Sequence, residues 1–332
     1  MSLWHLTETR LGEDLLLCDL HRAESIIREH LRRSGVPVSD LNDAVLSREV
    51  LVSERDKLGM VWYPGEVCCT LTSSSAHERW IGGPAACSGR FVTPSESAAF
   101  QGLDTHGGAF CSAQYHLTEI QLHHAIGASL HSRMADFAVT AVKLLLHPDA
   151  DVFTVGSLYS GAFDELGAAV KRVFGPVSTV FTAERQPKFC DVLREVYCPR
   201  YLLSEAGDAV GMPSVDILVA SPPCVEVSRA RRPSNRLGDP GINLNDLAEG
   251  AVHEQARVLT SVIMALLPRA VIVEQSDGLY THHRGLFTFL LGELTSLPYY
   301  VHHRTLDAHV DFRASHHRSR LLFVLIRSDC RA

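Results

Sequence analysis

The sequence predicts an α/β protein with a Rossmann-like, doubly wound and mostly parallel sheet, preceded by a small irregular α/β region. Two observations favour this fold class. From residue 151 onward, short apolar segments alternate with longer segments whose apolar residues recur every three or four positions. Glycine or polar residues follow these apolar segments directly, and ligands bind at this position in such sheets.

Each element of the predicted sheet has its own sequence signal. Apolar runs bounded by turn residues predict buried strands, and three- or four-residue spacing predicts helices. The expected strands are DVFTVGSLYSG, STVFTAE, VDILVAS, RAVIVEQ and SRLLFVLIR. The expected helices are FDELGAAVKRVFG, PKFCDVLREVY, LAEGAVHEQARVLTSVIMALL and LFTFLLGELTSL.

The chain before residue 151 is less regular. Residues 14–33 have the spacing of an amphipathic helix, and residues 50–90 mix β-like pieces such as MVWY with turn-rich segments. Thr93, Pro94 and Glu96 predict a short helix in TPSESAAFQ, because they form a capping box with proline at the first helical position. A longer helix is expected from about Ile126 to Leu146.

Composition excludes several classes of protein. No apolar run is long enough to span a membrane, and the first residues lack the basic and apolar segments of a secretory signal. The nine cysteines include no CxxC pair, which favours a reduced, intracellular protein without a metal site. The net charge of −7 argues against non-specific coating of nucleic acid, although a local basic cleft is compatible with it.

Polar residues at the predicted strand ends form the candidate site. Tyr159, Ser160 and Gly161 follow the first strand, and a glycine turn before a helix suits an adenosine-type ligand. Glu184 ends the next strand, where a carboxylate can accept hydrogen bonds from ribose hydroxyls, and Asp208 is a candidate for the adenine edge. Taken singly, a solvated carboxylate and an ordinary turn aspartate stay open as alternatives.

Cys224 and Glu274 are a stronger pair, because we expect them at the ends of neighbouring strands. A thiolate is a soft nucleophile, and a desolvated carboxyl group can give a proton to a ring nitrogen. Residues 225–246 are rich in Arg, Asn, Ser, Gly and Pro, and we expect a polar loop that folds over a phosphate backbone. Alone, Cys224 has a buried structural thiol as its alternative, and Glu274 a helix-cap partner.

These residues resemble the motifs of the DNA cytosine-5 methyltransferase family. SPPCVEVS is similar to its Pro-Cys nucleophile segment, VIVEQSDGL to the segment with its N3-protonating glutamate, and FRASHHRSRLLFVLI to its QxRxR segment. SLYSGAFDELGAAV and TVFTAE are similar to its cofactor-binding segments. The resemblance implies a fold of the S-adenosylmethionine-dependent methyltransferase type, with S-adenosylmethionine as cofactor and DNA as partner. The implied reaction is methyl transfer to C5 of a flipped cytosine.

The resemblance also implies residue roles. Cys224 would attack cytosine C6, Glu274 would protonate N3, and Arg320 would contact O2 with Arg318 behind it. The residues that the resemblance places at the cofactor are Tyr159, Ser160, Gly161, Glu184, Asp208 and Pro223. The residues expected to contact nucleic acid are Ser228, Arg229, Arg231 and Arg232.

Several positions depart from the family pattern. Val225 replaces the usual Gln, Gln275 replaces an Asn that normally braces the cysteine loop, and His316 replaces the Gln of QxRxR. Ala128 stands in the place of an Asn, and the glycine segment is one residue short. The nucleophile, the carboxylate and both arginines are retained, which favours an active enzyme.

The order of the segments implies a circular permutation. GRFVTPSESAAFQGL at 89–103 and AIGASLHSRMADFAVTAVKLLL at 125–146 resemble segments that follow the recognition region in the family. We therefore expect a target-recognition-like region at 1–88, the permuted C-terminal segments at 89–147 and the cofactor-binding catalytic domain at 148–330.

Two alternative functions stay open. SPPC also resembles the tRNA-methylating branch of the family, although that branch's Cys-Phe-Thr signature is absent. The changes at Val225, Gln275 and Ala128 also fit a catalytically silent DNA-binding or adaptor protein. We expect a monomer in the cytoplasm or nucleoid of a bacterial or viral system, or in a eukaryotic nucleus. The target sequence does not follow from the residues, nor does a role in restriction protection or regulation.

Overall fold

The computed structural model describes residues 51–56, 59–64, 80–82, 89–146, 152–224, 244–314 and 316–331. The helix predicted at residues 14–33 lies outside the described residues. Two compact units are present: one comprises Met1–Thr105, Thr118–Ala128 and Ala308–Arg318, and the other His106–Leu117, Ser129–Asp307 and Ser319–Ala332. No described helix is long and apolar enough to cross a membrane.

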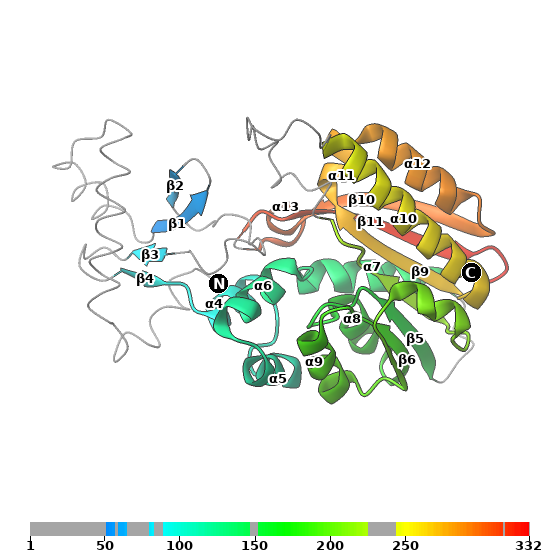
Figure 1. Ribbon diagram of the computed structural model, residues 1–332, viewed down its shortest axis with the longest axis horizontal. Coiled ribbons are helices and arrows are strands. Elements are labelled where there is room, and N and C mark those ends of the chain that lie inside the picture. Colours follow the sequence, from blue (N-terminus) through cyan, green and yellow to red (C-terminus); the bar gives the residue numbers. More distant parts are fainter. Residues whose placement is uncertain are drawn as a thin grey trace. The chain divides into compact units, whose positions relative to one another are not determined.

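The second unit is built on a seven-stranded sheet with the order β10-β11-β9-β8-β5-β6-β7 (Figure 1). Its strands are β5 (Phe153–Leu158), β6 (Val177–Ala183), β7 (Tyr201–Leu203), β8 (Ile217–Ala220), β9 (Ala270–Ser276), β10 (Tyr299–Asp307) and β11 (Ser319–Arg327). The strands from β7 to β9 pair in parallel, whereas β11 pairs antiparallel with both β9 and β10. The expected mostly parallel α/β sheet is therefore confirmed.

Helices cover both faces of this sheet (Figure 1). The helices of the unit are α5 (Gly108–His116), α7 (Ser132–Leu145), α8 (Glu165–Phe174), α9 (Pro187–Tyr197), α10 (Leu244–Leu266), α11 (Asp277–His282) and α12 (Arg284–Thr295), with a 3-10 helix η3 (Ala206–Gly211). On one face, Leu259 of α10 and Leu290 of α12 join a buried core with Val271 of β9 and Phe323 of β11. On the other face, α7 packs against α8 and β11, and α8 packs against β5.

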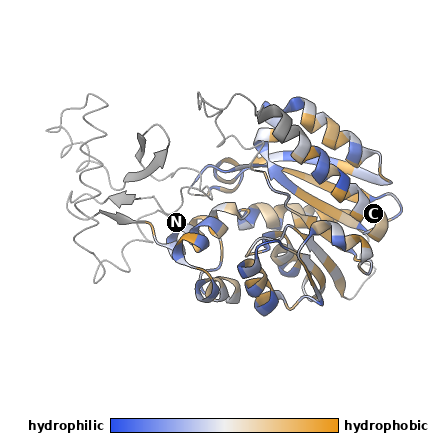
Figure 2. Cartoon of the chain, viewed as in Figure 1, coloured by the Kyte–Doolittle hydropathy of each residue, from blue (hydrophilic) through white to orange (hydrophobic). Residues whose placement is uncertain are grey.

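The interior strand β9 is buried along its whole length. Figure 2 shows β9 mainly in the hydrophobic colour, whereas α10 and α12 carry hydrophobic and hydrophilic residues together. A strand buried on both faces is typical of a parallel sheet between two helical layers. The carboxyl end of β9, where Glu274 and Gln275 lie, is therefore held on both sides by packed elements.

The first unit contains a four-stranded antiparallel sheet with the order β2-β1-β3-β4. Its strands are β1 (Leu51–Asp56), β2 (Gly59–Pro64), β3 (Trp80–Gly82) and β4 (Gly89–Phe91), and its helices are α4 (Pro94–Phe100), α6 (Glu119–Ala128) and α13 (Ala308–Phe312). Helix α4 begins as predicted, because the Glu96 N–H donates to Thr93 Oγ1 and the Thr93 N–H donates to Glu96 Oε2.

The prediction of a single helix from about Ile126 to Leu146 is wrong. Helix α6 ends at Ala128, and α7 begins at Ser132 with His131 as its N-cap. The Nδ1 atom of His131 accepts a hydrogen bond from the Arg133 N–H at 3.2 Å. Serine, threonine, asparagine and aspartate are the usual capping residues, so a capping histidine gave no sequence signal for this break.

Candidate active site

Strand register places the candidate residues at one level of the large sheet. Leu158 at the end of β5 is paired with Ala183 of β6 and with Ala220 of β8. Ala220 is paired in turn with Val273 of β9. At the next level lie Tyr159, Glu184 and Ser221, which directly follow β5, β6 and β8, and Glu274, which lies within β9. The parallel strands thus bring the predicted cofactor and catalytic residues to the same carboxyl edge.

The turn after β5 is closed by Glu184. The Gly161 N–H donates to Glu184 Oε2 at 2.9 Å, and the Gln186 N–H donates to Glu184 Oε1 at 2.7 Å. Gly161 has a φ of +61°, which favours glycine, and no atom lies within 4 Å of the position that a Cβ would take. Open backbone beside a carboxylate fits the ribose of an adenosine-containing cofactor.

Tyr159 lies between Glu184 and the corner that follows β8. It has a φ of 55°, and its half-buried ring packs against the core shared by α10 and the sheet. Burial raises the pKa of the Tyr159 hydroxyl to about 12, so the ring is neutral. A neutral aromatic ring at this edge suits a flat adenine.

A buried polar group supports this turn from below. Ser160 Oγ donates to Ser157 Oγ, and Ser157 Oγ donates to Asp164 Oδ1 at 2.7 Å. Asp164 also caps α8 by accepting from the Gly167 N–H. Burial raises the pKa of Asp164 to about 6. Asp164 and Ser157 were not predicted as site residues from the sequence, although an aspartate before ELGAAV is a recognisable N-cap signal.

Asp208 occupies a different setting. It lies on η3, is exposed, and its N–H donates to the carbonyl oxygen of Glu205. Glu205 forms a two-bond ion pair with the exposed Arg185, which directly follows Glu184. Helix η3 packs against α10 and against β6 and β7, so it lies on the face of the sheet that α10 covers.

Cys224 ends the Pro-Pro corner that follows β8. The Ser221 N–H donates to the Leu158 carbonyl at 3.2 Å, which extends the β5–β8 pairing by one residue. Cys224 is half-buried and packs against the core beneath α10. The Pro223 carbonyl accepts a 2.6 Å hydrogen bond from Gln255 Nε2 of α10, and Gln255 was not predicted as a site residue from the sequence.

Glu274 is joined to Arg320. The Arg320 Nε atom lies 2.7 Å from Glu274 Oε1, and both side chains are nearly buried. Leu322 of β11 is directly opposite Glu274, so Arg320 is its diagonal neighbour on the same face. A carboxylate and a guanidinium thus lie together at the sheet edge where Cys224 is found.

The other predicted residues are not brought into this group. Arg318 belongs to the first unit, where it is buried and its Nη2 donates to the Gly127 carbonyl at 3.0 Å. The expected nucleic-acid contacts, Ser228, Arg229, Arg231 and Arg232, lie outside the described residues. Within the part of the chain that the structure describes, no three His, Cys, Asp or Glu side chains are grouped as metal ligands.

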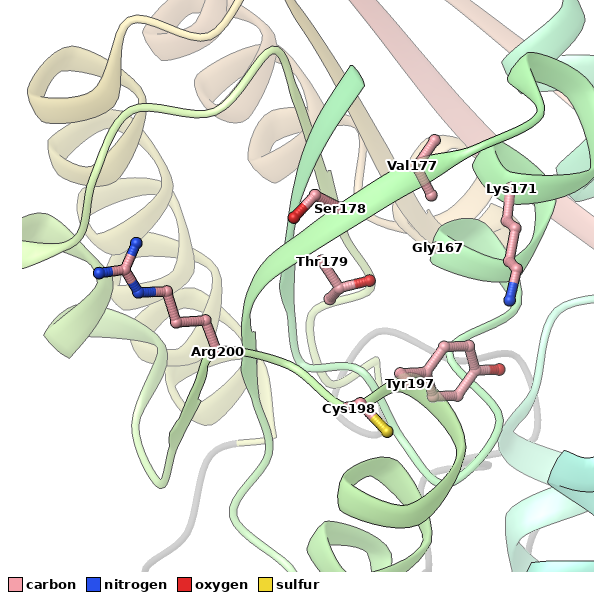
Figure 3. A pocket seen from close by; sticks show the side chains of 8 residues that line it. All are labelled: Gly167, Lys171, Val177, Ser178, Thr179, Tyr197, Cys198 and Arg200. Carbon is pink, nitrogen blue, oxygen red and sulfur yellow. The ribbon is translucent and has the colours of Figure 1, made fainter. Parts of the chain in front are cut away.

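A hollow of about 310 Å³ lies elsewhere, between α8, α9 and the start of β6 (Figure 3). Lys171 and Arg200 contribute its cationic side chains, but Figure 3 shows that Arg200 points away from Lys171. The residues from Val177 to Thr179 belong to the amino end of β6, opposite to the end that carries Glu184. This hollow is therefore separate from the candidate active site.

Residues 153–332 match the sequence profile described as C-5 cytosine-specific DNA methylase. The match covers more than half of the chain. The protein belongs to this family. The resemblance inferred from the motifs is thereby confirmed at the level of the methylase family. The comparison with curated proteins gave no match.

Several solved structures are similar to this methylase family member at low sequence identity. The Dnmt2 methyltransferase of S. pombe is 14% identical with a TM-score of 0.37, and the alignment covers 54% of this chain and 50% of that chain. TrmN from Thermus thermophilus is 15% identical with a TM-score of 0.39, covering 70% and 53%. The Entamoeba histolytica methyltransferase EhMeth is 13% identical with a TM-score of 0.39, covering 53% of each chain. The chain thus spans about half the length of these proteins.

Proposed function

We propose that the protein transfers a methyl group from S-adenosylmethionine to C5 of cytosine in DNA through a covalent adduct at Cys224. Membership in the methylase family supports the class of reaction. The strand register is the observation that carries the proposal, because it brings Tyr159 and Glu184 to the same edge as Glu274 and the Cys224 corner.

The base-binding part of the proposal rests on Glu274 and Arg320. Their 2.7 Å contact places a carboxyl group and a guanidinium side by side, and the proposed reaction uses the carboxyl group in its protonated form at N3 and the guanidinium at O2 of one pyrimidine. A cytosine inside a duplex does not expose C6 to a protein thiol, so the base has to leave the stack. The expected phosphate contacts from Ser228, Arg229, Arg231 and Arg232 remain part of this proposal.

The proposed chemistry conserves atoms and charge. The Cys224 thiolate forms a bond to C6 while Glu274 gives a proton to N3, which makes C5 nucleophilic. C5 accepts the methyl group that S-adenosylmethionine would supply, and the sulfur of the donor would keep the electron pair and leave as S-adenosylhomocysteine. Loss of the C5 proton to solvent then breaks the bond between sulfur and C6, and N3 returns its proton to Glu274. Both side chains end in their starting states.

The cofactor part of the proposal rests on the turn after β5. Tyr159 would cover the adenine, and Glu184 would accept hydrogen bonds from the ribose hydroxyls. Ser160 and Gly161 would border the cofactor through the backbone, and Asp208 and Pro223 would lie at its adenine side. Arg318 would support the position of Arg320 through the chain that joins them.

One assay tests this function. The protein is incubated with methyl-labelled S-adenosylmethionine and either duplex DNA or tRNA, beside Cys224→Ala and a control, Cys198→Ala, that removes an exposed thiol. We expect label in DNA for the wild type and the control, and none for Cys224→Ala. A covalent complex with DNA containing 5-fluorocytosine should form only when Cys224 is present.

The other results of this assay contradict the proposal in different ways. Label in tRNA alone would indicate the RNA-methylating alternative. Label on neither nucleic acid would indicate a silent protein of the same fold. Retention of activity in Cys224→Ala would exclude the covalent mechanism while leaving methyl transfer intact.

We further propose that the chain is circularly permuted, with a recognition-like region at 1–88, relocated segments at 89–147 and the catalytic domain at 148–330. The family match begins at residue 153, within the first strand of the sheet. Helix α7 precedes this strand, yet it packs against α8 and β11 of the matched part. This packing of α7 against the matched part supports the proposal that α7 corresponds to the last helix of the family.

A further inference from the structure

Two glutamine side chains connect the Cys224 corner to the end of β9. Gln255 Nε2 donates to the Pro223 carbonyl at 2.6 Å, and Gln275 Nε2 donates to Gln255 Oε1 at 3.0 Å. The Ser276 N–H donates to Gln275 Oε1 at 2.8 Å. These three hydrogen bonds form one continuous chain, which we call the glutamine relay. It joins helix α10 to the ends of β8 and β9.

The two ends of the relay fix the orientation of both amides. A carbonyl oxygen at Pro223 can only accept, so the NH₂ group of Gln255 has to face it. A backbone N–H at Ser276 can only donate, so the oxygen of Gln275 has to face it. These two requirements leave a donor on Gln275 and an acceptor on Gln255, which pair with each other. No alternative flip of either amide satisfies both ends.

The strand pattern explains why these two residues meet. Val271 and Val273 of β9 belong to the core beneath α10, and Gln275 continues that face because side chains alternate along a strand. Gln255 lies on α10 next to the buried Ala256. Gln275 is 1% exposed and Gln255 is 9% exposed, so neither amide can exchange its partner freely for water.

The relay holds the corner at its available backbone group. Pro222 and Pro223 have no N–H, so these two residues can form backbone hydrogen bonds only through their carbonyl oxygens. The Pro223 carbonyl belongs to the peptide bond that leads into Cys224. At its other end the relay accepts a hydrogen bond from the Ser276 N–H, in the peptide bond that follows Gln275. Gln275 directly follows Glu274 in the chain.

We propose that Gln255 and Gln275 are positioning residues that hold the Cys224 nucleophile in register with Glu274. This inference rests on the proposed function, since it concerns the geometry of the same reaction. In this chain Gln275 reaches the corner through Gln255. The substitution at position 275 is therefore compensated by a residue on α10.

The main test uses Gln255→Glu. Glutamate keeps the length of the side chain and an oxygen for Gln275, but its carboxylate cannot donate to the Pro223 carbonyl. We expect kcat for methyl transfer to fall by roughly 10- to 100-fold, because a misplaced nucleophile costs rate rather than binding. KM for DNA and the Kd for S-adenosylmethionine should stay within about twofold. Gln114→Glu, which makes the same change at an exposed position on α5, is the control.

The pH dependence of this variant separates positioning from general damage. A protonated glutamic acid can donate to the Pro223 carbonyl, and burial favours the protonated form. The ratio of Gln255→Glu activity to wild-type activity should therefore rise as the pH is lowered from about 8 to about 5.5. Gln255→Met has a similar length and neither hydrogen bond, so its ratio should stay low throughout this range. Proportional losses in kcat, cofactor affinity and thermal stability, without recovery at low pH, would overturn the inference.

A second measurement does not depend on methyl transfer. The rate of alkylation of Cys224 by iodoacetamide is followed by mass spectrometry, with the exposed Cys111 and Cys198 as internal references. We expect Gln255→Met to alkylate several-fold faster at Cys224 only, because loosening the corner exposes a half-buried thiol. An unchanged rate would contradict the relay even in an active enzyme. A faster rate in a protein that labels no nucleic acid would reject the proposed function and retain the relay.

Discussion

Asp164 shows how one buried side chain can set the shape of the turn beside the proposed cofactor position. Its φ is 40°, a left-handed conformation that aspartate and asparagine adopt more readily than most residues. Its Oδ1 atom accepts hydrogen bonds from Ser157 Oγ and from the Gly167 N–H. A Cβ at Gly167 would lie 2.2 Å from Asp164 Oδ2, so the carboxyl group fits tightly against the start of α8. This contact joins Asp164 to Gly167 within the glycine segment at 160–167, which is one residue shorter than the family pattern.

Replacing Asp164 with asparagine should remove a pH dependence from the stability. The pKa of Asp164 is raised by burial from 3.8 to about 6, so the folded state holds this proton more tightly than the unfolded state. The stabilising contribution is complete below about pH 3.8 and is lost as the pH rises through about 6. The loss amounts to about 3 kcal/mol of the free energy of unfolding. Asparagine keeps the accepting oxygen and does not titrate.

Urea unfolding at several pH values measures this effect. Relative to wild type, Asp164→Asn should gain about 2 kcal/mol between about pH 4.5 and about pH 7.5. Asp191→Asn, which changes an exposed carboxylate on α9, serves as the control and should show no comparable gain. Parallel curves for Asp164→Asn and wild type would show that the buried carboxyl group does not take up its proton in this range.

Individual residues also show what the sequence could not reveal. The motifs identified Cys224, Glu274 and Arg320, because each is carried by a local pattern next to a strand. Gln275 was interpreted as a lost brace, since its partner Gln255 lies on a separate helix and has no motif of its own. A hydrogen bond between residues so far apart depends on the packing of α10 on β9. Local spacing does not encode that packing.

At the scale of elements, a close contact between β5 and β6 shapes the sheet below the site. The pairing shifts between Val155 and Gly156, so Gly156 lies opposite Phe181 rather than Val180. A Cβ at Gly156 would lie 2.2 Å from the Phe181 ring, which is completely buried. A glycine inside a strand often marks such an approach of a neighbouring group. Tyr159 and Glu184 directly follow these two strands. The position of one relative to the other along the sheet therefore depends on the contact between Gly156 and Phe181.

Gly156→Ala should therefore destabilise the sheet and weaken cofactor binding. The Phe181 ring is completely buried, and overpacking in a core costs about 1–3 kcal/mol. Urea unfolding measures the stability, and calorimetric titration measures the affinity for S-adenosylmethionine. Adding Phe181→Leu should recover part of the loss, so that the two changes are not additive.

The control is Gly292→Ala in α12, where a Cβ meets no atom within 4 Å. This change should be neutral or stabilising by up to about 1 kcal/mol, because alanine favours the helix. Full additivity of Gly156→Ala and Phe181→Leu would contradict the proposed clash.

The elements that sequence periodicity predicted are those with a clear apolar face. Helix α9 begins and ends as expected in PKFCDVLREVY, and β9 coincides with its apolar run. Strand β10 was not predicted, because five of its nine residues are largely polar and most of its side chains are exposed. It forms a strand through its pairing with β11 at the edge of the sheet. Its strand structure therefore comes from pairing with the next strand of the chain rather than from its own pattern.

At the scale of the whole molecule, the family match does not coincide with a complete unit. Residues 153–332 contain the seven strands, but α7 lies outside the match. Met134, Ala135, Val139 and Val142 of α7 are completely buried, and the helix packs against α8, β9 and β11. Leu146 also forms a β-bridge with Arg331 near the other end of the unit. The matched part alone would expose this apolar surface.

Reordering the chain tests whether the link between α7 and β5 is needed. We expect a chain that starts at Val152, and carries residues 1–146 after Ala332 through a flexible linker of roughly 15 residues, to fold and bind S-adenosylmethionine. The reason is that α7 is held by its buried side chains, and a long linker adds only a small entropic cost. Residues 153–332 alone should fail to unfold cooperatively, because the surface beneath α7 is then exposed. Thermal unfolding and calorimetric titration distinguish these outcomes.

If residues 153–332 were as stable as the full chain, α7 would not belong to the catalytic unit. If the reordered chain did not fold, the link at 147–151 would be essential and the proposed permutation would lose its physical basis.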